Sequence, residues 1–103
     1  MTAFRVIYSD EALEELRGIR HYISHRLNNP PAASKQADRI MLATDSLAVF
    51  PKMHRIRIKD RKGREIRFFP VDSYMILYHV DEGKNVVNIL HIFSSRRDID
   101  SMI

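Results

Sequence analysis

Several residue types are rare or missing in this chain of 103 residues, which contains no cysteine, three isolated glycines and four prolines. Without cysteine, neither a disulfide framework nor a thiolate metal site can form. The scattered glycines exclude a glycine-rich phosphate loop. The chain also lacks a signal-peptide pattern and any run approaching the roughly 20 apolar residues of a membrane span. We therefore expect a cytoplasmic protein with no cofactor, no metal and no membrane partner.

Hydrophobic residues make up 45% of the chain and charged residues 29%, which is typical of a soluble globular protein and not of a disordered one. At this length one hydrophobic core is the default. We expect a single domain over residues 1–103.

Positive charge is concentrated in one segment. The net charge is +4, and residues 1–50 contribute none of it. Residues 51–71 hold eight basic and two acidic side chains, a local charge of +6. Such a segment speeds encounters with polyanions or acidic protein surfaces, although a solvated basic loop would look the same. The eight are Lys52, Arg55, Arg57, Lys59, Arg61, Lys62, Arg64 and Arg67.

The first half of the chain predicts one strand and two helices. Residues 3–8 are rich in β-branched and aromatic types, as in a strand. Ser9 or Asp10 offers an N-cap for a helix over residues 10–27, where apolar residues recur every three or four positions. Pro30 and Pro31 break this helix and suit the first turn of a second one, which should end at Phe50-Pro51. The two helices should form an antiparallel hairpin.

The second half predicts strands. Residues 54–59 and 64–69 form a strand or hairpin around the turn 60–63, and residues 73–80 and 85–93 form a β-hairpin. The predicted class is α+β: an N-terminal strand, a helical hairpin, then a three-stranded antiparallel meander in one twisted sheet. The helices should cover one face and leave the other open. Alternation places Tyr74, Ile76 and Tyr78 on the helix side, and Met75, Leu77 and His79 on the open side.

Histidines and arginines are the candidate functional residues. His21 and His25 stand four apart on the first helix, a spacing that could bind a metal. No cysteine or carboxylate completes a metal-ligand set, so the preferred interpretation is that the two histidines flank a core stripe. His79 and His91 lie on the strands of the hairpin, either as acid–base groups or as ordinary strand residues.

The arginines flank strands rather than helix faces, where guanidinium groups suit phosphate or carboxylate recognition. The alternative role is salt bridging to Glu65, Asp72, Asp98 and Asp100. The arginines concerned are Arg64, Arg67, Arg96 and Arg97.

An ordered series of short motifs runs along nearly the whole chain. Ile19-Arg20-His21-Tyr22-Ile23 is followed by Asn29-Pro30-Pro31-Ala32, by Leu47 with Phe50-Pro51, and by the long run from Phe69 to Asp81. The series closes on Val86-Val87, Ile89, Ile92 and Arg96-Arg97-Asp98. It resembles the RelE/ParE superfamily of toxins from type II toxin–antitoxin (plasmid stabilisation) systems.

This resemblance implies a cognate antitoxin as partner and one of two activities. RelE-like members cut mRNA on the ribosome, whereas ParE-like members inhibit DNA gyrase and are not enzymes. Under the ribonuclease pattern, Glu65, Arg67, His79 and His91 would be catalytic. However, the position after Tyr74, commonly arginine in the ribonucleases, is Met75, and no tyrosine or histidine follows Phe93. The enzyme assignment therefore stays open.

A ParE-like growth inhibitor that acts by binding is the first interpretation, with mRNA cleavage as the alternative. A basic nucleic-acid-binding module is a third, disfavoured because Tyr74 and Tyr78 share the face that should pack on the helices rather than form a base-stacking platform. The expected target-binding residues are Lys52, Arg55, Arg57, Arg64, Arg67, Arg96 and Arg97.

Overall fold

The computed structural model describes residues 3–95. Strand β1 (Arg5–Tyr8) leads directly into helix α1 (Asp10–His21). Ser9 is the N-cap, because its side-chain oxygen accepts a hydrogen bond from the Ala12 amide at 3.0 Å. The same hydroxyl donates to the Leu90 carbonyl at 2.8 Å, which ties the start of α1 to a distant strand.

The first helix continues past His21 as a π-helical turn, η1 (Tyr22–Arg26), so the predicted helical span 10–27 is helical almost throughout. Ile23 remains buried within this wider turn. Helix α2 (Pro30–Asp45) follows, with Asn29 as its N-cap and the two prolines in its first turn, as predicted. It ends in a 3₁₀ turn, η2 (Ser46–Ala48), short of the predicted end at Phe50.

Four strands follow the helices: β2 (Ile56–Lys59), β3 (Glu65–Val71), β4 (Tyr74–Asp81) and β5 (Val86–Ser94). The sheet order is β1-β5-β4-β3-β2, with β1 parallel to β5 and the other pairs antiparallel. The α+β class is confirmed. The meander has four strands rather than the predicted three, because the segment with the alternating Arg-Ile pattern pairs with β3.

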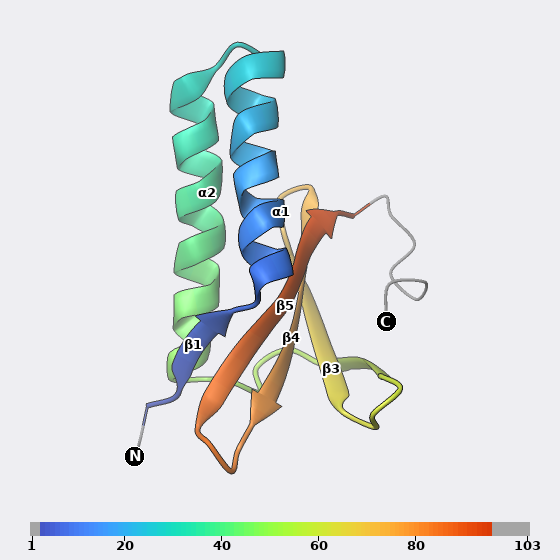
Figure 1. The fold of residues 1–103 in the computed structure, drawn as a ribbon. Coiled ribbons are helices and arrows are strands. Elements are labelled where there is room, and N and C mark those ends of the chain that lie inside the picture. Colours follow the sequence, from blue (N-terminus) through green and yellow to red (C-terminus); the bar gives the residue numbers. More distant parts are fainter. Residues whose placement is uncertain (1–2, 96–103) are drawn as a thin grey trace.

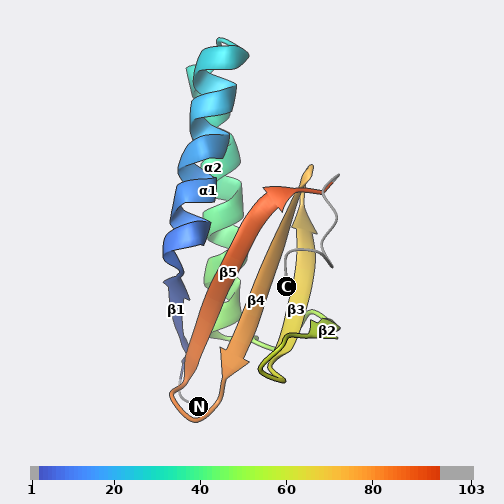
Figure 2. The ribbon, with the colours of Figure 1, turned by 45° about the vertical axis from the view of Figure 1, so that its right-hand side comes forward.

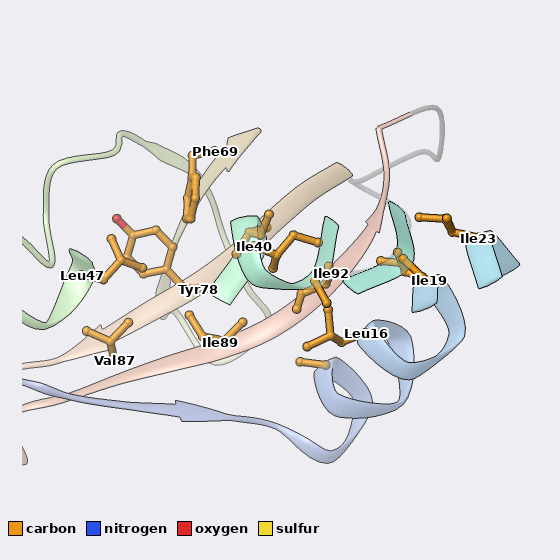
Figure 3. Packing of buried hydrophobic residues seen from close by; sticks show 14 residues of the cluster. Leu16, Ile19, Ile23, Ile40, Leu47, Phe69, Tyr78, Val87, Ile89 and Ile92 are labelled. Atoms are coloured by element: carbon orange, nitrogen blue, oxygen red, sulfur yellow. The ribbon is translucent and has the colours of Figure 1, made fainter. Parts of the chain in front are cut away.

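Helices α1 and α2 lie side by side against one face of the sheet, and the tip of their hairpin projects beyond it (Figures 1 and 2). Side chains from both helices point toward β3, β4 and β5 and form the main core (Figure 3). The predicted packing of Ile76 and Tyr78 against the helical stripes is confirmed. The residues concerned on the helices and η2 include Leu16, Ile19, Ile23, Ile40 and Leu47.

The opposite face of the sheet, here called the open face, carries a second apolar cluster. Ile66, Leu77 and Phe93 are buried there. Partly buried apolar residues surround them, namely Ile58, Phe68, Met75 and Leu90. The alternation predicted for Met75 and Leu77 is therefore confirmed, and this face is more apolar than its basic flanks suggest.

Candidate functional site

The basic segment does not form one cluster, because its residues divide between the two faces of the sheet. On the helix face, the β3 residues Glu65 and Arg67 line a hollow of about 240 Å³ with Lys52, Val80 and Glu82. The register supports this placement, since Arg67 pairs with the inward-facing Tyr78.

Both cations that line this hollow have partners within the fold. Arg67 donates from Nη1 to the His54 carbonyl at 2.7 Å, and Lys52 forms a salt bridge with Glu82. These contacts hold the segment before β2 against the sheet. Arg67 is thus partly a structural residue.

The same segment is fixed by aromatic packing. The His54 ring stacks on Phe69 at 4.1 Å, and the Tyr78 hydroxyl donates to the Pro51 carbonyl at 2.8 Å. Burial lowers the pKa of His54 and raises the pKa of Tyr78, because it penalises the charged form of each. Both side chains therefore favour their neutral forms in the fold.

Arg55 and Arg57 lie at the open face. Their guanidinium carbons stand 5.4 and 5.5 Å from the centre of the Phe68 ring. Cation–π contact is favourable at this range, so both guanidinium groups lie over the Phe68 ring on the open face.

The β2–β3 turn holds a further group of cations. The Asp60 carboxylate accepts hydrogen bonds from the backbone amides of Lys62 and Arg64, both at 2.9 Å, and from Arg64 Nε at 2.7 Å. Burial opposes ionisation of Asp60, but these hydrogen bonds and the Arg64 charge outweigh it and lower its pKa. Arg64 therefore pairs with Asp60 and not with Glu65 or Asp72, the acids that the sequence suggested. Asp72 pairs with Arg39 of α2 instead.

The two strand histidines have different partners. His79 Nδ1 donates to the backbone carbonyl of Glu65 at 3.1 Å. His91 Nδ1 donates to Glu15 of α1 at 3.3 Å, and the same Glu15 oxygen accepts the Ile92 amide at 3.0 Å. Strand β1 ends at Tyr8 and does not reach Ile92, so the Glu15 carboxylate accepts this amide of the β5 edge instead.

A departure from regular pairing also lies here. The register of β4 and β5 shifts between Leu77 and Tyr78, which leaves Leu90 as an extra residue in β5. Such a bulge redirects the neighbouring side chain. His91 consequently lines a hollow of about 350 Å³ between the start of α1 and the β2–β3 turn. The hollow is lined by Ser9, Glu11, Asp60, Arg61, Lys62, Arg64, Ile66, Leu77, Leu90 and His91.

The four residues that the ribonuclease pattern would require do not converge. Glu65 and Arg67 share the helix-face hollow, whereas His91 lines the hollow beside the β2–β3 turn. His79 Nδ1 donates to the backbone carbonyl of Glu65 and not to its carboxylate. Arg96 and Arg97 lie outside the described residues, so their predicted role stays a prediction.

Sequence reasoning missed Glu15 as the partner of His91, and it counted Arg61 and Lys62 only as part of the total charge. No short-range signal joins positions 15 and 91, because the contact depends on α1 lying along β5. The Asp60-Arg61-Lys62-Gly63 turn, by contrast, was visible in the sequence, and the Asp60 hydrogen bonds follow from it.

No group of three or more metal-binding side chains occurs among residues 3–95. His21 and His25 stack with ring centroids 4.3 Å apart, beside the helical core stripe. Among the helices of residues 3–95, none has the length and the apolar run that a membrane span requires.

A helical hairpin thus covers one face of the five-stranded sheet, and the opposite face is partly apolar with basic side chains beside it. Comparison with known proteins defines the class. Residues 6–99 match the family described as "ParE toxin of type II toxin-antitoxin system, parDE". The chain is 36% identical over 88 residues to Toxin RelE2 of Caulobacter vibrioides, covering 84% of this chain and 93% of that protein.

Solved structures agree on the fold. The chromosomal ParDE system of P. aeruginosa superimposes with a TM-score of 0.70 at 18% identity, covering 89% of this chain and 96% of that one. The archaeal RelE–RelB complex of Pyrococcus horikoshii OT3 gives 0.63 at 18% identity, covering 95% and 100%. This chain belongs to the ParE toxin family, within the RelE/ParE superfamily of type II toxin–antitoxin toxins.

Proposed function

We propose that this toxin inhibits growth by binding its target in the manner of ParE, with DNA gyrase as the target, rather than by cutting mRNA. The observation that carries the proposal is the separation of the candidate catalytic residues. General acid–base catalysis needs its groups within hydrogen-bond reach of one substrate, and Glu65 and His91 line different hollows.

The character of the open face supports the same proposal. Met75 lies there opposite Phe93 and beside the cluster of Ile66 and Leu77. An arginine at that position would bring a cation to a developing phosphorane charge, a contribution of a few kcal/mol. Met75 supplies no such charge, and its surroundings are apolar, which suits a protein interface better than phosphodiester cleavage.

A cognate antitoxin is the proposed regulatory partner. The archaeal RelE neighbour was solved with its RelB partner, and this chain offers matching chemistry. Arg55 and Arg57 suit acidic side chains, while exposed apolar residues beside β1 and η2 suit the apolar side of a partner segment. The latter line a hollow of about 430 Å³ and include Phe4, Val49, Phe50 and Met53.

The test is induction of the toxin without antitoxin, followed by two separate assays on the purified chain. We expect loss of gyrase supercoiling activity and intact ribosome-bound mRNA at stoichiometric toxin. Cleavage of mRNA in the ribosomal A site that disappears in Glu65→Ala or His79→Ala would establish the ribonuclease alternative instead. Binding to naked nucleic acid without either effect would favour the basic binding module.

A further inference from the structure

Gly18 lies inside helix α1, although neither its conformation nor its packing requires glycine. Its backbone does not have a positive φ, and a Cβ built at this position meets nothing within 4 Å. Glycine weakens a helix interior relative to alanine, but it lets another molecule approach the backbone closely. The missing side chain therefore leaves open space beside α1 that nothing in residues 3–95 fills.

This space belongs to a hollow of about 320 Å³ between α1 and the ends of β4 and β5. Gly18 and Tyr22 are exposed on its helical wall, and Tyr22 keeps 49% of its surface exposed. Tyr74 and Ser94 are half-buried on the strand side. The Glu15 carboxylate already accepts two hydrogen bonds from β5. A molecule that enters the hollow thus meets helix backbone and tyrosine rings.

The two tyrosines suit contact with a protein side chain. Each offers an apolar ring and a hydroxyl that can donate or accept a hydrogen bond. Burial raises the pKa of Tyr74, and the nearby Tyr22 raises it further, so the Tyr74 hydroxyl stays protonated. Tyrosines beside a pocket are typical of the residues that dominate the binding energy of protein interfaces. The hollow therefore has the chemistry of a receptor for an apolar anchor residue.

The place of the hollow in the chain favours the target over the antitoxin as its occupant. Ser94 precedes the predicted target-binding residues Arg96 and Arg97 by two and three positions. The surfaces proposed for the antitoxin lie elsewhere, at the arginines beside Phe68 and in the hollow beside β1 and η2. We propose that a large apolar side chain of DNA gyrase enters the hollow and packs on the backbone of α1. This inference rests on the proposed function and adds the place where the toxin contacts its target.

Substitutions at Gly18 test the inference, because they fill the hollow from the helix without removing a contact. Gly18→Ala and Gly18→Met should both leave the toxin folded, since alanine and methionine favour a helix. In gyrase supercoiling assays, the toxin concentration for half-inhibition should rise with the size of the new side chain, by at least about tenfold for Gly18→Met. Ser34→Met is the matched control and should inhibit like the wild type, because Ser34 is exposed on α2 outside this hollow.

Tyr22 provides a second measurement that does not depend on filling the hollow. Tyr22→Ala removes a ring from its wall and should also weaken gyrase inhibition at least about tenfold. Tyr22→Phe keeps the ring and should stay within about threefold of the wild type. Equal losses in the two variants would contradict the packing role of the ring.

The same variants are titrated with the cognate antitoxin by calorimetry, where unchanged affinity is expected. A loss of antitoxin binding that matches or exceeds the loss of gyrase inhibition would overturn the assignment of the hollow to gyrase. Gly18→Met that inhibits gyrase as well as the wild type would overturn the inference and leave the proposed function standing. A folded wild-type chain that leaves gyrase fully active would contradict the proposed function itself, and this inference with it.

Discussion

Ile76 occupies the centre of the main core with no exposed surface, between the strands and the helical hairpin. Truncation at such a site removes buried methyl groups and leaves a cavity. We expect Ile76→Ala to lower the free energy of unfolding by about 2–5 kcal/mol in urea titrations. Leu42→Ala is the control, because that side chain is 68% exposed and should change stability by less than about 0.5 kcal/mol. Equal stability of wild type and Ile76→Ala would contradict the packing described.

His54 links stability to pH. Burial lowers its pKa in the folded state, so at mildly acidic pH the unfolded chain binds more protons at this position. The contribution of neutral His54 to the free energy of unfolding is therefore complete above the ordinary histidine pKa of about 6.5. It is lost as the pH falls through the lowered pKa of His54 in the folded state. We expect the melting temperature of His54→Phe, which keeps a ring on Phe69, to fall less between neutral and mildly acidic pH than that of the wild type. Parallel pH profiles for the two proteins would exclude this role.

At the scale of elements, alanine substitutions at two glycines should change the stability in opposite directions. Gly18 lies inside α1, and a Cβ built there meets nothing within 4 Å. Gly18→Ala should therefore stabilise the chain by about 0.5–1 kcal/mol, because alanine favours the helix and loses less backbone entropy. Gly63 has positive φ in the β2–β3 turn, so Gly63→Ala should destabilise it. Thermal melts of both variants check the pair, and a stabilising Gly63→Ala would mean that the turn is not formed as described.

At the scale of the whole molecule, charge should govern encounter with the antitoxin. Exposed charges are screened as salt shortens the Debye length, so association should slow clearly between low and high ionic strength. Stopped-flow association rates measure this. Replacing Arg55 and Arg57 with glutamine should weaken the salt dependence more than replacing Arg17 and Lys35, which lie on the helices. An on-rate indifferent to salt would speak against electrostatic steering.

Toxicity also belongs to the whole molecule. An inhibitor that works by binding depends on charge-assisted contacts, whereas imidazoles matter mainly for proton transfer. We therefore expect growth inhibition to survive His79→Ala and His91→Ala and to fall when Arg96 and Arg97 are both replaced. Plating assays with matched expression levels measure it. Loss of toxicity in either histidine variant, with the protein still folded, would favour the ribonuclease alternative.

The sequence by itself determined the local elements and the family. Two of the signals are periodic: the helical stripe through Leu16 and Ile19, and the alternation around Ile76. The Ser9 cap depends on residues next to it in the chain. Each signal is local, so it predicts the structure of its own segment. The ordered motifs extend this to the toxin superfamily, which the comparisons confirm.

Only the tertiary structure decided which candidate residues meet. The parallel pairing of β1 with β5 and the Glu15–His91 contact join positions more than 70 residues apart, and the bulge at Leu90 interrupts the pairing of β5 with β4. No local pattern encodes such a register, because it follows from how α1 packs along an edge that β1 leaves unpaired. The same packing separates Glu65 from His91, so the sheet, and not the spacing of these residues in the chain, determines what chemistry they can share.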